Sequence, residues 1–148
     1  MMIFRSLDND DYRRGRLTTH KVYGEAMGDS LAGVALLNYA YEVMLTAFDT
    51  ADTPDCQAHV IQALKVMSHK TGLYGMLGGQ SVDVENDGKP MSREMIDYIY
   101  ENKTSALIEA SVMTGAILGG ATEEETAIVE KAAKISALRS RSRMISWM

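Results

Sequence analysis

Only two prolines, Pro54 and Pro90, occur in the 148-residue chain, and this scarcity constrains the fold more than any other feature of the sequence. Proline removes a backbone donor and breaks helices, so long proline-free stretches are free to be helical. The remaining composition is rich in helix-forming residues. Because apolar residues also recur at helical spacing along these stretches, we predict an all-α protein.

The first two helices are predicted at residues 30–49 and 55–70, where apolar residues recur every three to four positions. Ser30 is a suitable N-cap for the first of them. A short turn that is rich in Asp and Thr and contains Pro54 separates the two. Their apolar faces predict packing against other helices.

A long helix is predicted from Ser92, as its N-cap, to about Leu118. Gly119–Gly120 then ends it, since glycine is the preferred residue just beyond a helix. Thr122 and Glu125 have the spacing of a capping box, which predicts a last helix directly afterwards.

Composition and charge exclude several classes of protein. The net charge of −5 argues against general binding to nucleic acid. A lone cysteine, Cys56, excludes an internal disulfide and favours a reducing compartment, which predicts a cytoplasmic protein. We identify no signal peptide and no apolar run near the roughly 18–20 residues that span a bilayer, and therefore expect no membrane span. The length predicts a single domain over residues 1–148.

An acidic cluster directly precedes an arginine pair in the stretch DNDDYRRGRLTTHKVYGEA, which starts at Asp8. On a helix Asp10 and Arg14 would share a face, as would Asp8 and Asp11. Carboxylates hold hard cations such as Mg²⁺, and paired guanidinium groups suit diphosphate. The cluster predicts a metal–diphosphate site, with a solvated, self-paired helix end as the alternative.

Two further polar motifs interrupt apolar surroundings. The first is GGQSVD, in which Gln80 and Asp83 are three residues apart and would share a helix face. Its glycines predict a close backbone approach or a bend. The second is the pair Lys103–Thr104 within the long predicted helix. Taken singly, an ordinary turn and an exposed lysine are the alternatives.

These three motifs, in this order and spacing, resemble the polyprenyl synthetase family, the trans-isoprenyl diphosphate synthases, and most of all bacterial farnesyl and geranylgeranyl diphosphate synthases. The likeness runs from about Asp8 to Ile135, and includes the segment LAG-x-ALLNYAYE. It implies part of the isoprenoid-synthase bundle, with about five antiparallel helices. The implied reaction is Mg²⁺-dependent: an allylic diphosphate loses its diphosphate, isopentenyl diphosphate attacks the carbocation, and a proton leaves.

The resemblance also implies roles for single residues. Asp8 would be a Mg²⁺ ligand. Arg13 would bind the allylic diphosphate and Arg14 the isopentenyl diphosphate. The diphosphate-binding residues that it implies are Arg13, Arg14, Lys103, Thr104 and Gln80. It further implies a homodimer through the helices at 30–49 and 55–70, although their apolar faces are equally compatible with an ordinary core.

The chain departs from the family at both ends. Residues 1–7, MMIFRSL, replace a segment like HDDLPSL, and codons for HDDLP read one base later encode MMIF. Residues 137–148, ALRSRSRMISWM, likewise match the second aspartate-rich motif read one base later. We interpret 1–7 and 136–148 as out-of-frame ends. The alternatives are a divergent N-terminus and a basic, Arg/Ser-rich tail that binds nucleic acid or ends a helix.

Two functional hypotheses follow. In the first, the chain is a truncated prenyltransferase fragment that is inactive alone, because most of the carboxylates that hold Mg²⁺ are missing. In the second, it is a noncatalytic helical module that pairs with itself or with a full-length synthase. That module would expose apolar side chains such as Leu107, Met113 and Ile117.

Overall fold

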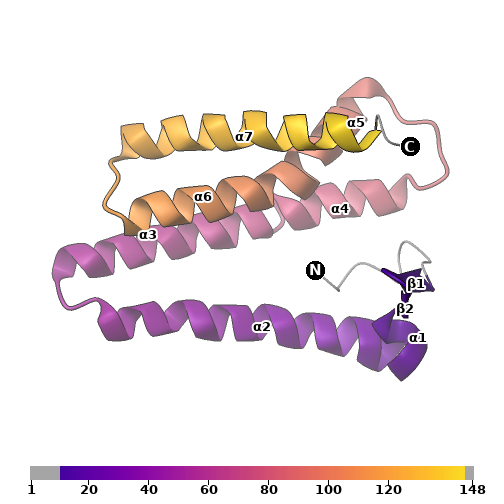
Figure 1. Ribbon diagram of the computed structural model, residues 1–148, viewed down its shortest axis with the longest axis horizontal. Coiled ribbons are helices and arrows are strands. Elements are labelled where there is room, and N and C mark those ends of the chain that lie inside the picture. Colours follow the sequence, from indigo (N-terminus) through magenta and orange to yellow (C-terminus); the bar gives the residue numbers. More distant parts are fainter. Residues whose placement is uncertain (1–10, 146–148) are drawn as a thin grey trace. The chain divides into compact units, whose positions relative to one another are not determined.

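The computed structural model describes residues 11–145 and confirms the all-α prediction (Figure 1). Apart from two strands of two residues each, the regular elements of this part of the chain are helices. The chain divides into two compact units, Met1–Thr50 and Ala51–Met148. The predictions for residues 1–7 and for the last three residues lie outside the described residues.

The first unit opens with an antiparallel hairpin of β1 (Tyr12–Arg13) and β2 (Arg16–Leu17). A short helix, α1 (Thr19–Tyr23), follows. The remaining elements form one long helical run: a π-helical segment η1 (Ala26–Leu31), α2 (Ala32–Leu45) and a 3₁₀ segment η2 (Thr46–Thr50).

The predicted N-cap at Ser30 is wrong. Ser30 lies inside η1, so the helical run begins before it. At Gly28 the segment η1 packs closely on the start of α1, where a Cβ would lie 2.4 Å from the backbone oxygen of Thr19. With hydrogen in place of Cβ, the turn of η1 that contains Gly28 continues past α1 without interruption.

The prediction that no stretch is apolar enough to span a membrane is corrected by the same run. Residues Ala26–Thr50 form 25 helical residues with a mean hydropathy of 1.4 in their most apolar window, which meets the length and composition of a membrane span. The extra length comes mainly from η1, which starts the helical run at Ala26, before the predicted start at residue 30. Core helices of soluble proteins meet the same criterion, so the finding concerns length and composition only.

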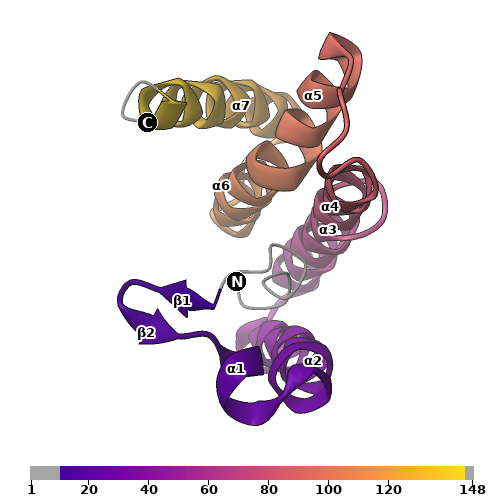
Figure 2. The same ribbon diagram turned by 90° about the vertical axis from the view of Figure 1, so that its right-hand side faces the viewer.

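The second unit is a layered set of helices (Figure 2). Its elements are α3 (Pro54–Thr71), α4 (Met76–Glu85), α5 (Arg93–Ile99), the π-helical segment η3 (Tyr100–Ser105), α6 (Ala106–Leu118) and α7 (Glu123–Ile145). Helix α6 packs against α3 on one side and against α7 on the other.

The predicted capping residues of this unit are confirmed. The Ser92 hydroxyl accepts a hydrogen bond from the Met95 amide at 3.3 Å. In the capping box, the Thr122 amide donates to the Glu125 carboxylate at 2.8 Å, and the Glu125 amide donates to the Thr122 hydroxyl at 3.2 Å. Both pairs satisfy donors that a helix start leaves without partners.

Small residues and a few large ones make up the core of the second unit. Met113 and Ile117 are buried, and Leu107 is half-buried. The expectation that these three side chains lie exposed is therefore wrong for Met113 and Ile117. They face the neighbouring helices because α6 is the middle element of the layer.

Candidate functional site

The geometry of the candidate site begins with the close contact between α4 and η3. A Cβ on Gly79 would lie 2.6 Å from the backbone nitrogen of Lys103 and 2.9 Å from the Asn102 Cβ. No residue other than glycine allows the two backbones this approach without a shift. The close approach that the glycine-rich motif predicted is therefore confirmed, and it brings two of the three sequence motifs together.

Lys103 forms an ion pair across this contact. Its Nζ lies 2.5 Å from Asp83 Oδ2, and the two side chains are 22% and 32% exposed. Asp83 is four residues beyond Gly79, which places both on one face of α4. The lysine is thus held by backbone packing at one end and by a carboxylate at the other.

Gln80 lies on α4 beside these residues and is only 2% exposed. Neither its side-chain oxygen nor its nitrogen has a hydrogen-bond partner within the described part of the chain. A buried amide without partners carries a free-energy cost that native proteins rarely accept. The sequence expectation that Gln80 and Asp83 share a face is confirmed by their common helix, three residues apart.

Lys103 and Thr104 lie in the π-helical segment between α5 and α6. A π segment inserts one extra residue into a helix and is frequent at functional sites. Lys103 and Thr104 are half-buried here, and Ser105 and Ala106 directly after them are buried. The sequence pattern predicted a regular helix here and did not indicate this insertion.

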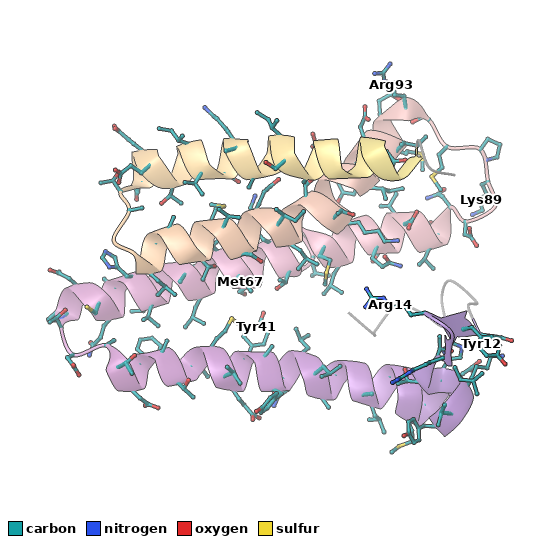
Figure 3. The ribbon with its side chains drawn as sticks, in the orientation of Figure 1. Tyr12, Arg14, Tyr41, Met67, Lys89 and Arg93 are labelled. Atoms are coloured by element: carbon teal, nitrogen blue, oxygen red, sulfur yellow. The ribbon has the colours of Figure 1, made fainter. Side chains whose placement is uncertain are left out.

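The arginine pair lies in the hairpin of the first unit, and the helical interpretation of this stretch is wrong. Arg14 and Gly15 form the turn between β1 and β2, with φ of 49° and 75°. Two consecutive positive φ angles are typical of the tight turns that match strand twist. The Arg14 side chain is exposed and projects from this turn (Figure 3).

The other two N-terminal candidates are Arg13 and Asp8. Arg13 pairs with Arg16 in the hairpin register, so its position is fixed by the backbone ladder. Asp8 lies outside the described residues. Within residues 11–145, Arg13 and Arg14 belong to the first unit, while Gln80, Lys103 and Thr104 belong to the second.

The described residues contain no group of three or more His, Cys, Asp or Glu side chains arranged to hold a metal ion. Asp83, the carboxylate of the GGQSVD motif, forms an ion pair with the ammonium group of Lys103. The Mg²⁺ ligand implied by the sequence, Asp8, is not among these residues.

A second charged cluster, centred on Lys70, was not predicted from the sequence. Lys70 Nζ lies 2.5 Å from both Glu109 Oε2 and Glu130 Oε1, and so joins α3, α6 and α7. Burial lowers the pKa of Lys70, but its hydrogen bonds to the two carboxylates outweigh this and hold its pKa above the ordinary value. The available signal was Glu109, a charged residue inside the apolar helix that follows Lys103.

This cluster forms part of the wall of a pocket of about 320 Å³ in the second unit. The rest of the wall includes the stacked rings of His69 and Tyr74. The Glu101–Lys134 ion pair, at 2.9 Å, also contributes. Side chains of both charges line the pocket, so it favours no single charge of ligand.

Comparison with known proteins gives a consistent set of relatives. The family model described as polyprenyl synthetase matches residues 7–138. Farnesyl diphosphate synthase of Geobacillus stearothermophilus is 40% identical over 121 residues, which cover 82% of this chain and 39% of that protein. A heterodimeric geranylgeranyl pyrophosphate synthase large subunit 2 of Arabidopsis thaliana is 37% identical over 131 residues, which cover 86% of this chain and 33% of that protein.

Solved structures agree with these sequences. An FPP/GFPP synthase of Zymomonas mobilis superposes with a TM-score of 0.77 at 28% identity, over 88% of this chain and 46% of that one. A geranyltransferase of Helicobacter pylori superposes with a TM-score of 0.72 at 28% identity, over 90% of this chain and 43% of that one. The chain thus spans about two fifths or less of the curated relatives cited and under half of these solved chains.

Proposed function

This chain belongs to the polyprenyl synthetase family, and from that premise we propose that it carries diphosphate-binding residues of a prenyltransferase and does not turn over substrate by itself. The parent reaction in this proposal is the condensation of isopentenyl diphosphate with an allylic diphosphate. The products would be farnesyl or geranylgeranyl diphosphate, in keeping with the names of the relatives.

One observation supports the binding role above all. The contact of α4 with η3 at Gly79 gathers Gln80, Asp83 and Lys103 within one small region. A partly exposed ammonium group beside a buried amide offers donors for the oxygens of a diphosphate. Lys103, Thr104 and Gln80 are therefore proposed to hold the allylic diphosphate. The roles proposed for the hairpin arginines come from the family resemblance alone: Arg13 would bind the allylic diphosphate and Arg14 the isopentenyl diphosphate.

Mg²⁺ is the proposed cofactor of the parent reaction. When bound, it would neutralise the departing diphosphate, which is the main chemical demand of this reaction. Asp8 is its proposed ligand in this chain. A single carboxylate cannot replace the several that, by the family resemblance, hold the Mg²⁺ cluster of a complete synthase.

The proposed inactivity of the isolated chain rests on this shortage of carboxylates. A diphosphate held by Lys103 alone would lack the metal charge that makes it a good leaving group. We also propose a cytoplasmic location, because a lone cysteine, Cys56, suits a reducing compartment.

The test is an assay of the purified chain with isopentenyl diphosphate, Mg²⁺ and either dimethylallyl or geranyl diphosphate. We expect no condensation product above the no-protein blank. Calorimetric titration with inorganic pyrophosphate and Mg²⁺ should nevertheless detect binding that the Lys103→Ala variant weakens. Turnover at rates comparable to a complete synthase would refute the proposed inactivity. Equal pyrophosphate affinity of Lys103→Ala and the unaltered chain would refute the role of Lys103.

A second candidate function is a noncatalytic module that pairs with itself or with a full-length synthase. The observation that favours it is the apolar character of α2, which buries only Gly33. Val34, Leu37 and Val43 are all at least 40% exposed on this helix. A helix with this many exposed apolar side chains is normally covered by other elements. The proposed homodimer contact includes this helix and α3.

Size-exclusion chromatography separates the two candidates. A module would elute as a dimer, or would shift into the peak of a full-length synthase when the two are mixed. Elution as a monomer in both experiments would contradict the module and the homodimer, and would leave the binding role of Lys103 unaffected.

A further inference from the structure

The ion pair between Asp83 and Lys103 is the best-defined contact of the candidate site. It joins α4 to η3 at 2.5 Å, and both side chains remain open enough for a ligand to reach them, at 32% and 22% exposed. The backbone of Lys103 is already fixed by its packing on Gly79. Backbone packing leaves the four-carbon side chain of the lysine able to rotate. The ion pair with Asp83 restrains the Nζ end of that side chain.

A lysine ammonium group has three donors, and a single carboxylate oxygen occupies one of them. The group can therefore keep its bond to Asp83 while it donates to an arriving anion. An unheld lysine loses side-chain freedom when it binds, and this loss reduces affinity. A lysine that is already ordered in the free protein avoids most of that loss.

We propose that Asp83 is a positioning residue that holds Lys103 ready for a diphosphate. The inference rests on the proposed function of Lys103 and goes beyond it by assigning a role to a residue that does not itself contact the anion. Asp83 acts through the geometry of the lysine, and its own negative charge makes it a poor ligand for phosphate.

The same carboxylate could instead compete with the anion for Lys103. Competition by charge is weakened by water and salt at this partly exposed position. Ordering of the long lysine stem is not screened in that way. Positioning by Asp83 would raise the affinity for the anion, whereas competition by Asp83 would lower it. The affinity after removal of the carboxylate therefore decides between the two.

The experiment measures binding of inorganic pyrophosphate in the presence of Mg²⁺ to the full 148-residue chain. Asp83→Ala should weaken binding about three- to tenfold, because Lys103 is no longer held. Asp83→Asn should stay within about twofold of the unaltered chain, because the amide oxygen still accepts a hydrogen bond from Nζ. Asp87→Asn, at an exposed position just beyond α4, removes an equal charge and should leave binding unchanged.

A double-mutant cycle separates positioning from a general structural effect. In the Lys103→Ala background, Asp83→Ala should weaken binding no further, because there is no ammonium group left to place. Circular dichroism checks that each variant is folded, and Asp83→Ser replaces the alanine variant if that one is not. Binding by Asp83→Ala that equals or exceeds that of the unaltered chain would overturn the inference and indicate competition.

A second readout does not depend on the ligand. NMR relaxation of the Lys103 Cε methylene group should show greater motion in Asp83→Ala than in Asp83→Asn or the unaltered chain. If Lys103→Ala binds pyrophosphate as well as the unaltered chain, the proposed function of Lys103 fails while the relaxation data still decide the positioning. Unchanged motion in Asp83→Ala would overturn the inference by itself.

Discussion

The two units of the molecule use apolar residues in opposite ways. In the second unit, α6 lies between α3 and α7 and buries Ala110, Met113 and Ile117 among them. In the first unit, the equally apolar α2 buries only Gly33. The comparison teaches that apolar content does not by itself make a core: α6 packs against α3 and α7, whereas α2 leaves most of its apolar side chains exposed.

The largest expected effect that sharpens this comparison comes from the charged cluster of the second unit. Lys70→Ala leaves Glu109, which is 5% exposed, without its cation, and should cost about 3 kcal/mol of unfolding free energy. Lys65→Ala, at an exposed position of the same helix, should cost under about 0.5 kcal/mol. Urea unfolding followed by circular dichroism measures both. Equal costs would show that the cluster does not hold the three helices together.

The raised pKa of Lys70 adds a pH dependence to this prediction. A group whose folded pKa lies above its unfolded value stabilises the protein fully below the unfolded value, which is 10.5 for lysine. Its contribution is lost as the pH rises through the folded pKa. Above a pH of 10.5, the unaltered chain should therefore lose its advantage over Lys70→Ala. A gap that stayed constant through this range would contradict the assignment.

A matched pair of truncations compares the two units directly. Met113→Ala should cost about 2–4 kcal/mol, because it opens a cavity between α6 and its neighbours. Leu37→Ala removes a comparable side chain from α2, where it is 40% exposed, and should cost under about 1 kcal/mol. The same unfolding assay applies. The comparison breaks if Leu37→Ala proves as costly as Met113→Ala, since α2 would then have a buried face.

A smaller effect is expected at the contact of α4 with η3. Gly79→Ala places a methyl group where the Lys103 backbone nitrogen lies, and should cost about 1–3 kcal/mol. Gly115→Ala is the control: nothing lies within 4 Å of a Cβ there, and alanine favours a helix. Pyrophosphate binding should weaken in the first variant only. Unchanged unfolding and binding in Gly79→Ala would mean that the contact does not place Lys103.

The smallest effect concerns the start of α7. Hydrogen bonds from the Thr122 amide and hydroxyl lower the pKa of the Glu125 carboxyl. A lowered folded pKa stabilises the chain above the unfolded value, and this contribution is lost as the pH falls through the folded pKa. Glu125→Gln should therefore unfold at a slightly lower temperature than the unaltered chain at neutral pH, and the gap should close in acid. Calorimetric melting at several pH values measures it.

Helix ends and the glycine contact were predictable because a local rule governs them. Ser92 and the Thr122–Glu125 pair act through neighbours three residues away, which the sequence shows directly. Gly79 required only the rule that glycines within a helix indicate a close approach. The partner in that approach, the Lys103 backbone, was not indicated by the sequence and is known only from the structure.

Other features depended on contacts that the sequence does not display. Arg14 was expected on a helix, but the dipeptide Arg14–Gly15 adopts positive φ angles and turns the chain into a hairpin. Lys70 and Glu130 are 60 residues apart, so only the packing of α3 and α7 around α6 brings them together. The π segment η3 likewise reflects tertiary packing, because its residues have no sequence signature of their own.

That segment also limits how the gene can change. Because η3 holds one residue more than a regular helical turn, loss of a single codon between Ile99 and Ala106 would restore an ordinary α-helix. Everything after the deletion would then rotate by about 100° relative to what precedes it. Either the side that buries Met113 would face water or Lys103 would swing away from Asp83. Among descendants of this sequence, the length of this stretch should therefore stay constant.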